Sequence, residues 1–193
     1  MFKYLLKSQR GAMFGLDARV AMVIFGTASV LAGTAIFGSM REFESRAMAK
    51  ELRAMHQAVE GIHNDLQAAV RSRLTTPNDT NSFTALYTDT VLTAAGQARW
   101  LGPYITLSSN THPSYGAVSL TRRSTANAPG SACTATDGTC YLYLLYTAVP
   151  DGVITELDEE FDNSDGNTAG LIQRGVVAGQ TDNLYFRTIK NMR

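Results

Sequence analysis

The sequence has few of the residues from which catalytic and metal sites are built. It contains three histidines and two cysteines in 193 residues. The motifs of phosphate-binding loops, dinucleotide-binding folds, zinc metalloproteases and serine hydrolases do not occur in it. His112, in the segment NTHPSY, has no nucleophile near it in the sequence, and we interpret it as an exposed loop residue. These absences predict a protein that is not an enzyme and that has no cofactor.

The chain also has no net charge at pH 7, because its 17 Lys and Arg residues balance its 17 Asp and Glu residues. A protein that binds nucleic acid by general attraction to phosphate needs an excess of positive charge, so no direct nucleic-acid binding is expected. Charged residues make up 18% of the chain and hydrophobic residues 45%, which is typical of a globular rather than a disordered protein. The length suits one ordinary domain with an extension.

The two cysteines, Cys133 and Cys140, lie close together in the sequence. Two cysteines do not make a disulfide-dense scaffold, but they are compatible with one bridge in an oxidising compartment. We expect a single short-range disulfide in an exported domain. Two reduced thiols in a loop are the alternative.

Charge is absent from one long apolar stretch, residues 20–40, which is long enough to cross a bilayer as a helix. It follows a leader, residues 1–12, with three basic residues and no acidic one, and this charge keeps the N-terminus on the cytoplasmic side during insertion. Small residues near the end of the stretch leave an ordinary signal peptide open as well. Asp17 lies just before the stretch, where neither a plain anchor nor a signal peptide needs a carboxylate.

Residues 41–74 contain no proline and continue the helical pattern. Apolar residues recur at steps of mostly four and three, which places them along one stripe of a helix. They are Met48, Leu52, Met55, Val59, Ile62, Leu66, Val70 (or Ala69) and Leu74. The sequence therefore predicts one unbroken helix over residues 13–74, ended before Pro77, whose stripe docks on the following domain. A coiled-coil seam is the alternative. His56 and His63 are expected to face solvent or a partner.

Residues 75–193 are expected to form a globular domain, because turn-forming residues alternate there with β-branched and aromatic runs. One short helix is expected within residues 84–100, where Trp100 would anchor the core, and another over residues 151–162, capped by Asp151. Strands are expected at 104–109, 115–122, 140–148, 171–177 and 183–189. The predicted fold class is α+β, with one long N-terminal helix packed on a small antiparallel sheet.

The segment DEEFDNSDGNT, residues 158–168, gathers acidic residues near a glycine. Some calcium-binding loops do the same, but the regular spacing of acidic residues in those loops is not matched here. A polar loop that closes a helix explains the composition equally well, so no metal site is predicted. If calcium does bind, Asp162 and Asp165 are the expected ligands.

The order of features at the N-terminus resembles that of type IV pilins and of the pseudopilins of type II secretion. In that family a prepilin peptidase removes a basic leader and methylates the new N-terminus. A cut between Ala12 and Met13 makes Asp17 the fifth residue, where the family has an acidic residue. A cut after Gly11 is the alternative and makes Asp17 the sixth. Residues 100–105 and 156–172 are also similar to segments of pseudopilins and pilins.

The resemblance implies a structural subunit that assembles from the inner membrane into a helical filament. Residues 13–40 would lie first in lipid and then in the filament core, where Asp17 pairs with the amine of Met13 on a neighbouring subunit. Phe14, Gly26 and Gly33 are the other residues expected to take part in assembly. The implied partners are other copies of the chain, prepilin peptidase, membrane lipid and the pilus or type II secretion assembly machinery. The implied location is the inner membrane and then an extracellular filament or a periplasmic pseudopilus.

Two other interpretations remain open at this point. The chain fits an uncut single-pass membrane protein that displays a small extracytoplasmic β domain for binding. It also fits a secreted domain released by signal peptidase, including an unrecognised hydrolase. The three interpretations differ in where the chain is cut, and Asp17 favours the filament subunit.

Overall fold

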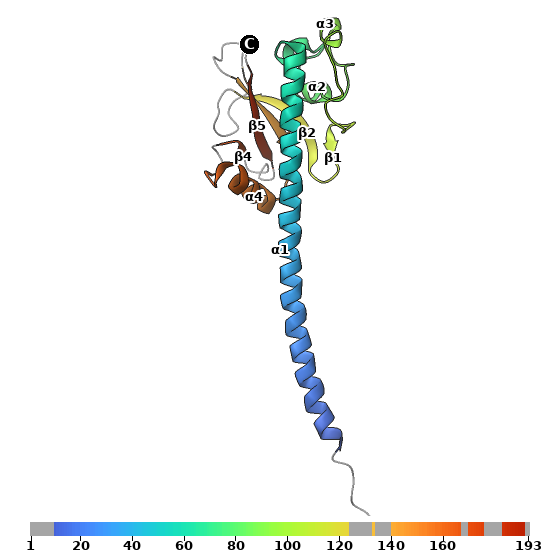
Figure 1. Cartoon of the computed structure of the whole chain (residues 1–193), viewed down its shortest axis with the longest axis vertical. Coiled ribbons are helices and arrows are strands. Elements are labelled where there is room, and N and C mark those ends of the chain that lie inside the picture. The colour runs from blue at the N-terminus through green and yellow to red at the C-terminus, as the bar shows by residue number, and fades with distance from the viewer. Residues whose placement is uncertain (1–9, 124–132, 134–139, 167–169, 176–182, 192–193) are drawn as a thin grey trace, which may run out of the picture. The chain divides into compact units, whose positions relative to one another are not determined.

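The computed structural model describes residues 10–123, 133, 140–166, 170–175 and 183–191, and it belongs to the α+β class, as predicted (Figure 1). The chain divides into two compact units, residues 1–41 and 42–193, and helix α1 contributes to both. The helices are α1 (Arg10–Leu66), α2 (Asp79–Thr84), α3 (Ala94–Gln97), α4 (Asp151–Asp162) and the 3-10 helix η1 (Val70–Arg73). The strands are β1 (Thr111–His112), β2 (Gly116–Arg123), β3 (Cys140–Tyr146), β4 (Ile172–Arg174) and β5 (Leu184–Asn191).

The second unit is built around an antiparallel sheet with the strand order β1-β2-β3-β5-β4. Because side chains alternate between the two faces of a strand, the register places one apolar set on a single face. Leu120 pairs with Leu144, Leu144 with Phe186, and Phe186 with Ile172, and all four are buried. This row crosses four strands and forms the sheet side of the core. Cys140, the first residue of β3, forms a disulfide bond with Cys133.

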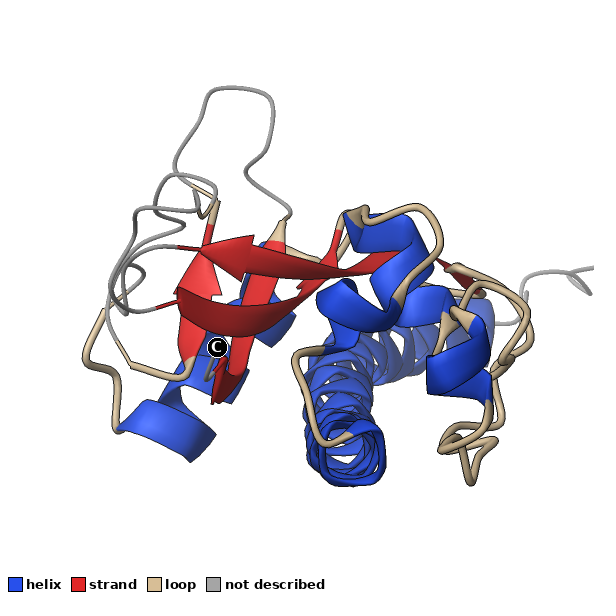
Figure 2. Cartoon of the chain, turned by 90° about the horizontal axis from the view of Figure 1, so that it is seen from above, coloured by secondary structure: helices blue, strands red, loops and turns tan. Residues whose placement is uncertain are grey.

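The part of α1 after residue 41 supplies the other side of this core, and Figure 2, which looks down the helix, shows it lying against one face of the strands. The apolar stripe predicted from the sequence is buried along its whole length. Its members from Met48 to Leu66 are at most 4% exposed, and each belongs to the same core cluster as the sheet residues. The stripe is therefore a docking face within the chain, as predicted, and not a free coiled-coil seam.

The predicted end of the long helix is wrong by two turns. Helix α1 ends at Leu66 because Gln67 adopts a left-handed backbone conformation with φ of 48°. A 3-10 helix follows, and Leu74 then forms an isolated bridge with Leu92. Val70 and Leu74 are nevertheless buried in the core. The apolar spacing in the sequence extends beyond the end of the helix because the chain after Gln67 turns back and buries Val70 and Leu74 in the same core.

The strand predicted at residues 104–109 does not form. The backbone amide of Tyr104 donates to the carbonyl of Leu86, and Ile105 and Leu107 pack against the core without a neighbouring strand. Their alternating apolar pattern reflects direct packing rather than sheet pairing. The other four predicted strands correspond to β2, β3, β4 and β5, although residues 176–177 of the predicted strand 171–177 lie outside the described residues.

Side-chain environments correct two smaller expectations, those for Asp151 and for the two histidines, and agree with a third, that Trp100 packs against the core. Helix α4 has the predicted bounds, but Pro150 is its N-cap, and the Asp151 carboxylate pairs with Arg174 instead of capping the helix. His56 and His63 are half-buried rather than solvated, and the Nδ1 atom of each is buried without a hydrogen-bond partner. Trp100 is half-buried against the core, where its indole nitrogen donates to the Ala85 carbonyl at 2.9 Å.

Replacing Leu52 by alanine tests how strongly the α1 stripe holds the second unit together. Leu52 is fully buried, so we expect Leu52→Ala to lower the free energy of unfolding by about 2–5 kcal/mol through lost burial and a cavity. Lys50, an exposed neighbour on the same helix, supplies the control. Lys50→Ala is expected to change the free energy of unfolding by less than about 0.5 kcal/mol. Urea unfolding followed by the fluorescence of the single tryptophan measures both. Equal unfolding curves for the two variants would contradict the core assignment.

Candidate functional site

The first candidate site is the apolar surface of α1 before residue 41. Within α1 an 18-residue window reaches a mean hydropathy of 2.1, and none of that window is buried. Met22, Phe25 and Leu31 are each at least 70% exposed. Isolated apolar side chains on a surface are ordinary, but a continuous exposed apolar segment marks a site of contact with lipid or protein. By length and composition this helix could span a membrane.

Three of the four hydroxyl side chains within this apolar segment donate to carbonyl groups of the helix itself. Thr27 donates to the carbonyls of Val23 and Ile24 at 3.0 Å each. Thr34 donates to Leu31 at 2.9 Å, and Ser39 donates to the carbonyl four residues earlier at 3.1 Å. An unsatisfied polar group in hydrocarbon costs several kcal/mol, so such internal bonds are what a helix without water requires. These three hydroxyls therefore do not oppose insertion into lipid.

The residues expected to act in processing and assembly all lie on α1. Gly11, Ala12, Met13 and Phe14 are helical in their backbone, but their side chains are outside the described part of the structure, as is the rest of the leader before Arg10. Asp17 is exposed, and no ion pair or hydrogen bond is found for its side chain among the described residues. Gly26 and Gly33 have no atom within 4 Å of where a Cβ would stand. Their faces are thus open to a neighbouring helix.

The second candidate site is a polar cluster in the second unit that joins α1 to two strands. The Glu51 carboxylate on α1 accepts a hydrogen bond from the Tyr146 hydroxyl of β3 at 2.9 Å. Its other oxygen lies 3.1 Å from the Nε2 atom of His112 on β1. Tyr146 is fully buried, and only 13% of the His112 side chain is exposed. Burial and the nearby Glu51 charge raise the pKa of the Tyr146 hydroxyl, so it remains a donor.

The orientation of His112 is fixed by its own turn. Its Nδ1 atom accepts hydrogen bonds from the backbone amides of Ser114 and Tyr115, both at 3.1 Å. An imidazole nitrogen that accepts cannot carry the proton, so in the neutral ring Nε2 carries it and donates to Glu51. The ring also stacks on Tyr115 with a centroid separation of 4.7 Å. The interpretation of His112 as an exposed loop residue is therefore wrong, and the histidine helps to fasten α1 to the sheet.

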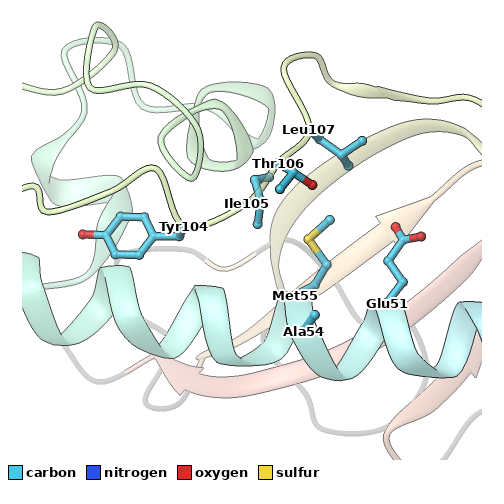
Figure 3. Close-up of a pocket in the computed structure, with 7 residues that line it drawn as sticks. All are labelled: Glu51, Ala54, Met55, Tyr104, Ile105, Thr106 and Leu107. Carbon is cyan, nitrogen blue, oxygen red and sulfur yellow. The ribbon is translucent and has the colours of Figure 1, made fainter.

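A groove of about 290 Å³ lies beside this cluster, between α1 and residues 104–107. Figure 3 shows Glu51 and Met55 on the helix and the chain segment that contains Tyr104 opposite them. The Tyr104 hydroxyl donates to the Asp65 carboxylate at 2.5 Å, and burial together with this bond raises its pKa to about 12.

The third candidate site lies at the end of α4, where the structure brings together three carboxylates. Asp158 joins Asp162 and Asp165, and each offers an oxygen within 4.8 Å of those of the other two. From the sequence, Asp162 and Asp165 were the ligands expected if calcium binds, although the residue spacing of a known calcium-binding loop is not matched there. That expectation missed Asp158, although a spacing of four residues on a predicted helix places Asp158 and Asp162 on one face and was the available signal. Residues 167–168 of the acidic segment lie outside the described chain.

Comparison of the chain with protein families, with curated proteins and with solved structures finds no match.

Removing the Glu51 carboxylate tests whether the polar cluster fastens α1 to the sheet. We expect Glu51→Ala to lower the free energy of unfolding by about 1–3 kcal/mol, because it leaves the buried Tyr146 hydroxyl without a partner. Glu60→Ala is the matched control, since Glu60 lies on the same helix, its side chain is 51% exposed, and it pairs with His56 at 3.3 Å. We expect Glu60→Ala to change the free energy of unfolding by less than about 0.5 kcal/mol. Chemical denaturation compares them, and an equal loss in both variants would contradict the assignment.

Proposed function

We propose that this chain is a structural subunit of a helical filament of the type IV pilus or type II pseudopilus kind. The observation that carries the proposal is the exposed apolar segment of α1 with Asp17 at its beginning, an acidic residue for which the described residues supply no ion pair. The α+β fold, in which a long N-terminal helix packs on a small antiparallel sheet, supports it. The chain acts by assembly and not by catalysis, and its partners are other copies, a prepilin peptidase and an inner-membrane assembly machinery.

The proposal gives Asp17 a physical role. A carboxylate among packed apolar helices is costly unless it is paired and hydrogen-bonded. The new amine of Met13 on a neighbouring copy supplies the opposite charge once the leader has been removed. This pair offsets its own desolvation only when the two helices have the right axial stagger, so it selects a register more than it adds stability. Gly26 and Gly33 let neighbouring helices approach closely, because a glycine face has no side chain.

A filament subunit also explains the two environments of α1. The segment before residue 41 lies in lipid before assembly and among other helices after it. The segment after it belongs to the folded unit that carries the sheet. That unit then faces the periplasm or the exterior, where its disulfide Cys133–Cys140 is stable against reduction.

The N-terminus of the mature protein tests the proposal first. We expect intact mass and N-terminal sequencing of protein from the native membrane or from sheared surface material to give a chain that begins at Met13 and is heavier by one methyl group. A start at Ala12 instead would place the cut after Gly11 and would leave the filament proposal in place. A start at Met1 would support the uncut single-pass membrane protein. A start after about residue 35 would support a secreted domain.

The Asp17 side chain provides a second test, which measures assembly directly. We expect Asp17→Ala to leave a stable, membrane-inserted protein but to reduce the yield of sheared filament at least tenfold, because the register pair is lost. The conservative variant Asp17→Glu keeps the charge and is expected to assemble. Membrane fractionation reports insertion, and immunoblotting of the sheared fraction reports assembly. A normal filament yield from Asp17→Ala would refute the register role.

A further inference from the structure

The carboxylate cluster at the end of α4 contains an acidic side chain whose environment is incomplete. Asp158 is only 7% exposed, and its Oδ1 atom is buried without a hydrogen-bond partner. An unsatisfied buried acceptor costs about 1–3 kcal/mol, and a charged one costs more. None of the ion pairs among the described residues involves Asp158, Asp162 or Asp165. The buried oxygen therefore lacks the positive partner that a buried carboxylate requires.

The other two carboxylates point toward the same place. A Cβ added to Gly170 would lie 2.5 Å from the Asp162 Oδ2 atom and 2.7 Å from the Asp165 Oδ2 atom, so both side chains converge on this glycine. Asp162 is held there because its Oδ2 atom accepts the backbone amides of Leu171 and Ile172, both at 2.7 Å. Three acidic side chains thus share a small volume between the last turn of α4 and the start of β4.

The chemistry of the donors selects the kind of ligand. All three are carboxylates, which suit hard cations, while zinc sites in proteins are dominated by cysteine and histidine. Oxygens bound to one calcium ion at about 2.3–2.6 Å are separated by at most about 5 Å, and the three oxygens here lie within 4.8 Å of one another. Magnesium holds its ligands at about 2.0–2.1 Å in a stricter octahedron, so it fits a partly exposed, loosely spaced cluster less well.

We propose that Asp158, Asp162 and Asp165 form a calcium-binding site that ties the end of α4 to the beginning of β4. Asp158 supplies the buried ligand and Asp165, which is exposed, the outer one. Water completes the coordination sphere, because calcium takes six to eight oxygens. The site is independent of the filament function, since it lies wholly in the second unit.

A calcium titration of the full chain in detergent micelles tests this proposal. After removal of divalent ions, we expect one calcium per chain to bind with a dissociation constant of about 0.1–1 mM, the range of extracellular modules. At 10 mM calcium the thermal midpoint of the second unit is expected to rise by roughly 2–6 °C. Magnesium at the same concentration is expected to produce a smaller shift. Calorimetry and thermal unfolding give the readouts, and neither depends on assembly.

Three variants with the same change in formal charge separate a built site from general attraction. Asp165→Asn and Asp158→Asn are expected to weaken calcium binding at least tenfold. Glu159→Gln, at the exposed position next to Asp158 on α4, is the matched control and is expected to bind as the unchanged protein does. We further expect Asp158→Asn without calcium to be no less stable than the unchanged protein, because it removes a buried charge that no cation among the described residues pairs.

The proposal is overturned by any of three results. The first is no saturable binding up to 10 mM calcium. The second is equal calcium affinity in Asp165→Asn and Glu159→Gln, which would indicate diffuse attraction to an acidic surface. The third is equal binding of magnesium and calcium. Far-UV circular dichroism confirms that each variant is folded before its titration.

Discussion

The packing of one stripe of α1 against the sheet is the interaction on which the second unit depends. The stripe runs from Met48 to Leu66 and is continued by Val70 and Leu74 after the helix has ended. It faces a row of apolar side chains that crosses four strands in register. Non-directional burial alone would let the helix slide or rotate on this surface. The bonds from His112 and Tyr146 to Glu51 are directional, and they fix the helix at one position along the strands.

Much of this fold could be predicted from the sequence, because residues buried on one face of a helix or strand recur at regular intervals along the chain. The apolar spacing of Met48 to Leu66 identified the docking face, and α4 and four strands were placed from the same kind of pattern. The end of α1 could not be predicted, since Gln67 turns the chain in a left-handed conformation that sequence patterns associate with glycine. Residues 104–109 alternate like a strand, but only the tertiary structure decides whether an alternating segment finds a partner strand.

The candidate sites were less predictable than the fold. The role of His112 depends on Glu51, which is 61 residues away in the sequence, and no local pattern records such a pairing. Asp158 was missed for a different reason, because only the folded chain shows that it is buried beside Asp162 and Asp165. Asp17, before a run of uncharged residues, is the clearest sequence signal for the proposed contact between copies, because no ion pair for its side chain is found among the described residues.

The proposed transfer of the apolar segment from lipid to a filament depends on how its hydroxyl groups are bonded. A hydroxyl that already donates to its own helix gains nothing from a lipid tail or from an adjacent polypeptide. At Thr27, Thr34 and Ser39 the enthalpy of hydrogen bonding is therefore the same in both media. Partitioning between them is then decided by the fit of the large side chains, such as Phe25 and Leu31, and by the electrostatic energy of a single carboxylate.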